Sequence, residues 1–225
     1  MVSKEYPRIG EKIYHAELPN GLHIYVDRRP EFQSYAFFAT NYGGMDMKFR
    51  LDGQWRDTPA GVAHFLEHKM FDTEDGNALQ DLAANGASPN AFTSSALTGY
   101  YFESTEKFCD NLKILLSFVS IPWFTQESVD KEQGIIGQEI RMVEDDPDNQ
   151  VFYGLMECLF DHHPIRVPIA GTQESISHHR RHPLRLPQGV LHPLQHGAHC
   201  GGGRGAGRGG AHCPGNPAEG AGRAH

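Results

Sequence analysis

The segment GVAHFLEHKM, residues 61–70, places two histidines and a glutamate close together in a stretch with helical periodicity. Because an α-helix turns by about 100° per residue, His64, Glu67 and His68 share one face of that helix. Two imidazoles one turn apart can bind one metal ion, and a carboxylate between them can reach a water molecule on that metal. The opposite face carries apolar side chains, which are those of Val62, Phe65, Leu66 and Met70. The pattern predicts a metal site, although the short motif H-x-x-E-H would also describe two surface histidines beside an ordinary surface glutamate.

Local patterns predict the elements that must position these side chains. Thr58 and Pro59 are typical of a helix start, so we expect the helix that carries His64 to run from about residue 59 to 71. Asn20-Gly21 lies between two alternating segments and predicts a β-hairpin. We expect further strands in SYAFFATNYGG and NAFTSSALTGYYFES, and further helices in NALQDLAANGA, TEKFCDNLKILLSFVS and QVFYGLMECLFD.

A long helix that begins after Thr125 supplies further carboxylates. Glu132 and Glu139 lie two turns apart on one side of this helix. Gly134 and Gly137 each cost about 1 kcal/mol relative to alanine in a helix interior, so we expect close packing at these positions. Short strands and helices in unequal alternation predict an α+β fold, with a layered antiparallel sheet packed against helices.

The bulk composition excludes some classes of protein. The chain has 225 residues, a net charge of −8 and no apolar run near the roughly 18 residues that a membrane span requires. Four cysteines without paired spacing indicate a reducing compartment, so we expect a cytoplasmic protein that does not act at a membrane. Residues 1–177 carry a charge of −13, which argues against nucleic acid as the partner of this part.

Several motifs in order resemble a known family. GVAHFLEHKMF, GASPNAFTSSALTGYYF, PWFTQESVDKEQGIIGQEIRMVEDDPDN and HHPIRVPIAGTQESIS together resemble the N-terminal domain of the pitrilysin/insulinase family of zinc peptidases, close to its bacterial processing-peptidase-like branch. The resemblance covers about residues 10–177. It implies that His64 and His68 bind one zinc ion, that Glu139 is the third ligand and that Glu67 is the general base. It also implies that Glu132 orients a ligand or the zinc-bound water; a solvated helix carboxylate is the alternative interpretation of Glu132.

The implied function is that of a zinc metalloendopeptidase domain that hydrolyses extended peptides through a zinc-bound water. The stretch SPNAFTS resembles the family's substrate-binding strand edge, which would place a peptide against Asn90 and Ala91; an ordinary edge strand is the alternative. A homologous second half or a partner chain is an expected partner. The alternatives are a non-catalytic peptide-binding or partner subunit and an inactive frameshift product.

Three other groups of residues invite chemical interpretations that we disfavour. The carboxylates of EDDPDN, which begin at Glu144, are expected to form a helix end and a turn, so Glu139 is the preferred third ligand. His162-His163-Pro164 is expected to be a turn. His15 and His23 flank the hairpin and are not expected to have a chemical role.

The sequence changes character after Ser177. Residues 178–225 contain eight of the fourteen histidines, six arginines, one acidic residue and no aromatic residue, a composition that cannot bury enough apolar surface to offset its ordering entropy. We therefore divide the chain into an incomplete peptidase domain, residues 1–177, and an aberrant, disordered tail, residues 178–225. An arginine/glycine-rich nucleic-acid tail and a Cys/His metal tract are alternatives. Permitted codons for residues 178–197, read one base later, can encode TTADTLYACHKVFYTPSNMA, which resembles the family's continuation, so we interpret the tail as the product of a single-base frameshift.

Overall fold

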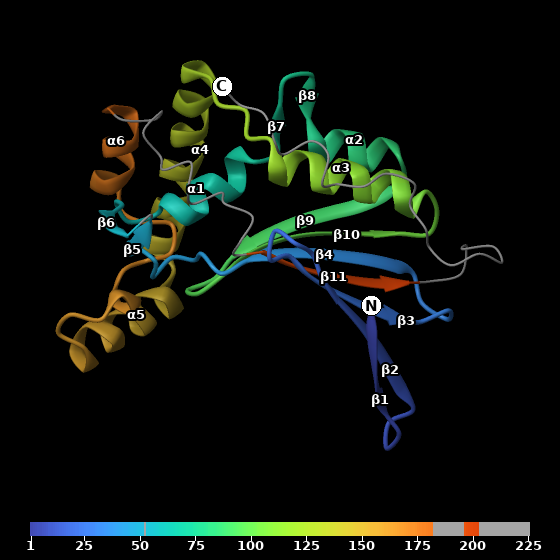
Figure 1. The fold of residues 1–225 in the computed structure, drawn as a ribbon. Coiled ribbons are helices and arrows are strands. Elements are labelled where there is room, and N and C mark those ends of the chain that lie inside the picture. Colours follow the sequence, from blue (N-terminus) through green and yellow to red (C-terminus); the bar gives the residue numbers. More distant parts are fainter. Residues whose placement is uncertain (52, 182–195, 203–225) are drawn as a thin grey trace.

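A seven-stranded sheet organises the chain in a computed structural model that describes residues 1–51, 53–181 and 196–202 (Figure 1). The strand order is β1-β2-β3-β11-β4-β10-β9, and neighbouring strands are antiparallel except for β3 and β11. The strands are β1 (Val2–Tyr6), β2 (Glu11–Glu17), β3 (His23–Arg28), β4 (Ser34–Thr40), β9 (Ala87–Thr93), β10 (Thr98–Ser104) and β11 (His196–Gly202). Two hairpins lie outside this sheet: β5 (Lys48–Leu51) with β6 (Gln54–Asp57), and β7 (Asp72–Thr73) with β8 (Gly76–Asn77).

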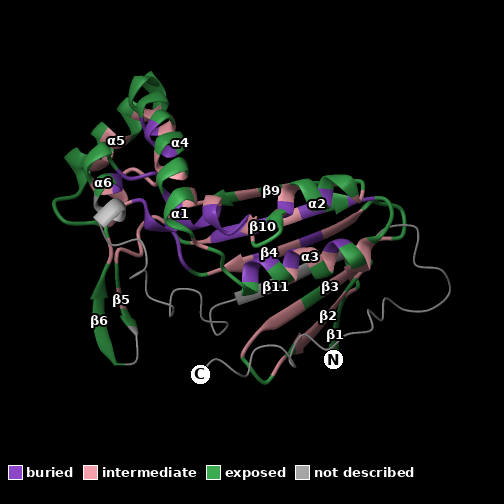
Figure 2. Ribbon diagram, turned by 90° about the horizontal axis from the view of Figure 1, so that it is seen from above, coloured by how far each residue is buried: buried purple, intermediate pink, exposed green. Residues whose placement is uncertain are grey.

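Helices α2 (Ala78–Ala84) and α3 (Phe108–Ser120) cover one face of the sheet (Figure 1). Alternate residues of the central strands point to this face, where Phe38 of β4 and Phe102 of β10 are buried with Leu82 and Phe118 of the helices. The purple segments of α2, α3 and β10 mark this core in Figure 2. The layered α+β fold predicted from the sequence is confirmed.

The remaining helices gather at one end of the sheet (Figure 1). They are α1 (Val62–Lys69), α4 (Gln126–Asp145), α5 (Pro147–Leu159), the short 3₁₀ helix η1 (Pro164–Arg166) and α6 (Gln173–Arg181). Phe65 of α1 packs with Ile136 and Ile140 of α4 and Ile176 of α6 in a second core. This core holds α1 against α4, the two helices on which the predicted metal-site residues lie.

Helix α1 begins later than predicted. Gly61, not Thr58, precedes its first residue, and Gly61 has a left-handed backbone (φ 85°). The hydroxyl of Thr58 instead donates to the carbonyl of Met47 at 3.3 Å, so it does not cap the helix. A Cβ atom at position 61 would lie 2.5 Å from the carbonyl oxygen of Ala170, so both the backbone and the packing at this turn require glycine.

The two glycines of α4 differ in their surroundings. Gly137 is buried beside Gln173, whose side-chain amide donates to the Gly137 carbonyl at 2.6 Å. Nothing lies within 4 Å of a Cβ placed at Gly134, so the prediction of close packing was correct for Gly137 and wrong for Gly134.

Two described segments fall at or beyond the predicted domain boundary. Helix α6 extends to Arg181, and β11 pairs with β3 on one side and with β4 on the other. The rest of the predicted tail, residues 182–195 and 203–225, lies outside the described residues.

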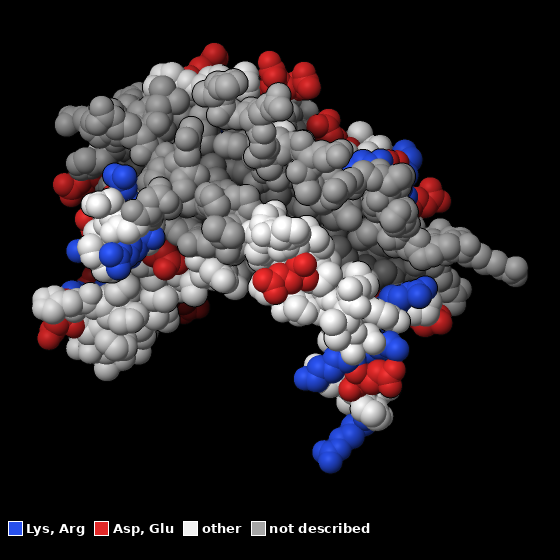
Figure 3. Space-filling model, viewed as in Figure 1, with Lys and Arg blue, Asp and Glu red and all other residues white. Residues whose placement is uncertain are grey.

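The β1–β2 hairpin projects away from α2 and α3 (Figure 1). Its surface carries side chains of both charges (Figure 3), among them the ion pair of Lys12 and Glu5 at 2.9 Å. Among the described residues, no helix combines the length and apolar character that crossing a membrane requires.

Candidate metal centre

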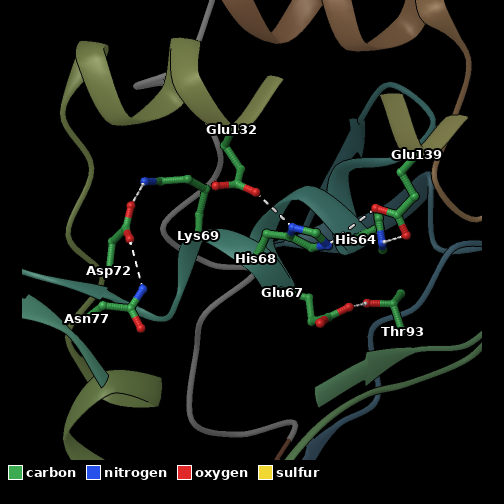
Figure 4. A network of polar contacts seen from close by, with 9 residues as sticks. All are labelled: His64, Glu67, His68, Lys69, Asp72, Asn77, Thr93, Glu132 and Glu139. Atoms are coloured by element: carbon green, nitrogen blue, oxygen red, sulfur yellow. Dashed lines mark hydrogen bonds and ion pairs between the residues drawn. The ribbon is translucent and has the colours of Figure 1, made fainter. Parts of the chain in front are cut away.

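Two helices bring the predicted site residues together. Helix α1 presents His64, Glu67 and His68, and α4 presents Glu132 and Glu139 toward them (Figure 4). The imidazole rings of His64 and His68 lie edge to face with their centroids 4.6 Å apart. Their positions follow from the amphipathic pattern of α1, because the apolar side chains of Phe65 and Leu66 are buried in the cores on either side of the helix.

The Glu139 carboxylate lies between the two imidazoles. Its oxygens are 3.5 Å from Nε2 of His64 and 3.6 Å from Nε2 of His68. Ligand atoms bound to one tetrahedral zinc ion at about 2.0–2.1 Å lie about 3.4 Å from one another. Each imidazole nitrogen thus lies near this spacing from one of the two oxygens of the Glu139 carboxylate, so the three side chains fit as protein ligands of one zinc ion.

Glu132 contacts the other side of the His68 ring. Its carboxylate oxygen is 2.8 Å from Nδ1 of His68, so Nδ1 is the donor in this contact, and in the neutral ring the lone pair is left on Nε2. Nδ1 of His64 is buried, and no described residue forms a hydrogen bond with it.

The environment moves the pKa values of the two histidines in opposite directions. Burial lowers the pKa of His64, and the neighbouring His68 lowers it further. Burial would also lower the pKa of His68, but the hydrogen bond that this ring donates to Glu132 and the charges of Glu67, Glu132 and Glu139 outweigh it, so this pKa is raised. A neutral His64 is the form that can bind a metal ion without first losing a proton.

Glu67 lies on the same face of α1 but is turned toward the sheet. Its carboxylate accepts a hydrogen bond of 2.9 Å from the hydroxyl of Thr93 at the end of β9 (Figure 4). Burial raises the pKa of Glu67, and the Thr93 hydroxyl limits this rise. A carboxylate with a raised pKa is a stronger base, which suits proton transfer near neutral pH.

The other predicted site residues lie on β9, which is an edge strand of the sheet. Asn90 and Ala91 precede Thr93 on this strand, and the Asn90 side chain accepts a hydrogen bond of 2.8 Å from the Ala91 N–H.

Sequence reasoning did not identify Thr93 as a site residue. The strand alternation could have identified it, because residues 91 and 93 share the face of β9 that is turned toward α1.

The disfavoured carboxylates of EDDPDN serve as predicted at a helix boundary. Asp146 ends α4 and caps α5, where its side chain accepts from the N–H of Asp148 at 2.9 Å. The His163 side chain caps η1 in the same way, through the N–H of Ile165.

A buried ion pair adjoins the site and was not predicted. Lys69, next to His68, is completely buried, and its ammonium group donates to the carboxylate of Asp72 in β7 (Figure 4). This pair ties the end of α1 to the β7–β8 hairpin.

The chain is similar to known proteins over most of its length. Residues 53–173 match the model of the insulinase family, peptidase family M16. The chain is 47% identical over 177 residues to the uncharacterized zinc protease YmfH of Bacillus subtilis, covering 77% of this chain and 41% of that protein. It is 30% identical over 165 residues to the uncharacterized zinc protease ML0855 of Mycobacterium leprae, covering 71% of this chain and 36% of the relative.

Two solved structures are similar to the chain in fold. An M16-like peptidase from Alicyclobacillus acidocaldarius superposes with a TM-score of 0.79 at 38% identity, covering 91% of this chain and 48% of that one. A protease from Helicobacter pylori shares the fold, with a TM-score of 0.71 at 17% identity over 87% of this chain and 47% of that one. The chain thus spans less than half the length of these relatives. The family match, together with the paired histidines and glutamates of α1 and α4, shows that the chain belongs to the M16 (insulinase) family of peptidases, as its sequence motifs predicted.

Proposed function

We propose that this chain is a zinc-dependent metalloendopeptidase domain that hydrolyses peptide bonds of extended peptides. The observation that carries the proposal is the Glu139 carboxylate at 3.5 and 3.6 Å from the two histidine Nε2 atoms, with Glu67 beside them. His64, His68 and Glu139 would hold the zinc ion. When bound, zinc would supply a Lewis acid that activates water and polarises the scissile carbonyl group.

Glu67 is the residue that moves protons in this proposal. Its carboxylate takes a proton from the attacking water and passes it to the leaving amine as the peptide bond breaks. The hydroxyl of Thr93 holds one carboxylate oxygen in place. Glu132 positions His68 through the hydrogen bond at Nδ1 and keeps Nε2 available as a ligand.

The free edge of β9 is the proposed substrate-binding surface. An extended peptide that adds to this edge would pair with the backbone at Asn90 and Ala91, close to Thr93 and Glu67. The Ala91 N–H is already bound by the Asn90 side chain, so this side chain must move before a peptide can pair there. Main-chain pairing of this kind binds extended peptides largely independently of their sequence.

Cleavage of an internally quenched extended peptide by the zinc-loaded chain tests the proposal. We expect Glu67→Gln to lower the rate by about 10²- to 10⁴-fold, because it removes the general base while leaving the zinc content unchanged. Glu106→Gln, at an exposed position before α3, is the matched control and should cleave at the wild-type rate. Equal rates for Glu67→Gln and wild type would contradict the proposal.

A further inference from the structure

Helix α5 carries a stripe of large apolar side chains that are mostly exposed. The α5 stripe consists of Val151 (72% exposed), Phe152 (45%), Leu155 (51%) and Leu159 (61%). Their spacing in the helix places them on one face. Figure 2 shows α5 green along most of its length. Single exposed apolar residues are normal on a protein surface, whereas several on one face mark a surface that binds another molecule.

A different face of α5 attaches the helix to its own domain. Asn149, Tyr153 and Met156 are the half-buried residues of α5, and they lie on that face. The Tyr153 hydroxyl accepts a hydrogen bond of 3.4 Å from the N–H of Ile169. The main contacts of α5 are with α4 and η1. The α5 stripe is therefore not needed to hold the helix in place.

The charges around the α5 stripe narrow the class of partner. Residues 147–159 contain no lysine or arginine, and their two carboxylates, Asp148 and Glu157, are exposed. Helices that bind anionic membrane surfaces carry lysine and arginine beside their apolar face, and proteins that bind nucleic acids neutralise phosphates with the same residues. The composition of α5 argues against both, so an apolar protein surface is the partner that it fits.

The two ends of α5 carry opposite charges. Asp145, Asp146 and Asp148 are exposed at its start, and none forms an ion pair with a described residue. Arg166 of η1 lies beyond the other end, where its guanidinium donates to the carbonyl of Asp161 and has no carboxylate partner among the described residues. An antiparallel second copy of α5 would bring the acidic start of each helix to the cationic end of the other.

We propose that the α5 stripe is the contact surface of a two-fold symmetric dimer of this chain, in which the α5 helices of two copies pack antiparallel. A two-fold axis brings the same patch of both copies together, so the patch must be complementary to itself. The α5 stripe meets this condition with the axis near Leu155. Val151 of one copy then faces the partner's Leu159, and the opposite charges meet at both ends.

The size of the α5 stripe determines how tightly the dimer is held. A standard interface buries about 800 Å² per partner, and interfaces of less than about 1,200 Å² in total belong to transient complexes. Four partly exposed side chains on one helix cover less than the standard area. The dimer is therefore reversible and depends on the concentration of the chain.

Sedimentation velocity of the full chain, from micromolar to millimolar concentration, tests the proposal. We expect the mass to rise from 25.1 kDa toward twice that value. Leu155→Glu places a charge near the axis in both copies and should weaken dimerisation by at least about tenfold. The matched control, Ile9→Glu, changes another exposed aliphatic residue and should dimerise as wild type. A chain that stays monomeric, or equal dimerisation of Leu155→Glu and wild type, would overturn the proposal.

A crosslink tests the antiparallel arrangement without depending on the loss of the dimer. With the axis near Leu155, cysteines at position 155 of the two copies face each other. In a Cys158→Ser background, mild oxidation should join Leu155→Cys chains into disulfide-linked dimers. Glu157→Cys, exposed on another face of α5, should stay unlinked. Equal yields from the two variants, or no linked dimer from Leu155→Cys, would overturn the arrangement.

Discussion

Within residues 1–177, two pairs of histidine rings lie in contact, and their surroundings differ. His64 and His68 lie one turn apart on a helix, and three carboxylates from α1 and α4 approach them. His15 and His23 lie on adjacent strands, and the register places a single exposed carboxylate, Glu17, across from them. The comparison teaches that two neighbouring histidines are not by themselves a metal site: the rings of the strand pair are joined by their own hydrogen bond, whereas carboxylates of a second helix surround the helical pair.

The largest expected effect concerns the anchoring of the helical pair. Asp72→Asn leaves the ammonium group of Lys69 completely buried without its counter-charge. Removing one partner of a buried ion pair costs about 3–5 kcal/mol, and we expect a loss of about 3 kcal/mol because Asp72 itself is partly exposed. Urea unfolding of the metal-free protein measures this loss.

The matched control is an exposed ion pair of the same kind. Asp110 and Lys113 are 3.1 Å apart on the surface of α3, and Asp110→Asn should change the free energy of unfolding by less than about 1 kcal/mol. If the two aspartate substitutions had equal effects, the buried pair would not be what anchors α1.

A smaller effect is expected on the zinc affinity of the helical pair, His64 and His68. Glu132→Gln keeps a hydrogen-bond acceptor beside Nδ1 of His68 but removes its charge, so we expect zinc affinity at the α1 site to fall by about tenfold. Competition with a chromophoric chelator measures this affinity. Glu157→Gln, on exposed α5, is the control and should have wild-type affinity; the same affinity in Glu132→Gln would remove Glu132 from the site.

The smallest effect is expected on the pKa of Glu67, the proposed general base. Thr93→Val removes the hydrogen bond that opposes the rise in the pKa of Glu67, so this pKa should rise further. The acidic limb of the pH–rate profile should then move to higher pH, because Glu67 must be ionised to accept a proton. Carbon-13 shifts of the labelled carboxyl group measure the pKa directly. Thr93→Ser keeps the hydroxyl and should behave as wild type; a lower pKa in Thr93→Val would be contrary to this account.

The core of the fold and the faces of α1 and α4 could be predicted from the sequence. Helical periodicity places His64, Glu67 and His68 on one side of α1, and Glu132 and Glu139 two turns apart on α4. Helical periodicity does not predict that α1 and α4 pack against each other. That association was supplied by the resemblance to the family, and it depends on Phe65 and Ile136 in a shared core.

Contacts between residues distant in sequence explain what could not be predicted. Gly61, not Thr58, precedes α1, and a Cβ at this position would lie 2.5 Å from the carbonyl oxygen of Ala170, which is more than one hundred residues away along the chain. Thr93 reaches Glu67 only once β9 is placed beside α1. The contact of His15 with His23 depends on a diagonal across two strands, which the hairpin signal alone does not specify.

The aberrant tail remains a prediction. Strand β11, which pairs with both β3 and β4, contains three glycines, at positions 197, 201 and 202, although glycine weakens a strand interior. A frameshift near codon 178 would account for such residues at a central position. Resequencing the gene tests this proposal, and an uninterrupted native reading frame would contradict it.

The most direct test of the central claim is the zinc-to-protein ratio of the purified chain, measured by elemental analysis after removal of loosely bound metal. We predict a ratio near one for wild type and for Glu144→Gln, and near zero for Glu139→Gln, because the Glu139 carboxylate lies 3.5 Å from Nε2 of His64 and 3.6 Å from Nε2 of His68. A ratio near zero in the wild-type chain, or an unchanged ratio in Glu139→Gln, would contradict the assignment of His64, His68 and Glu139 as the metal site.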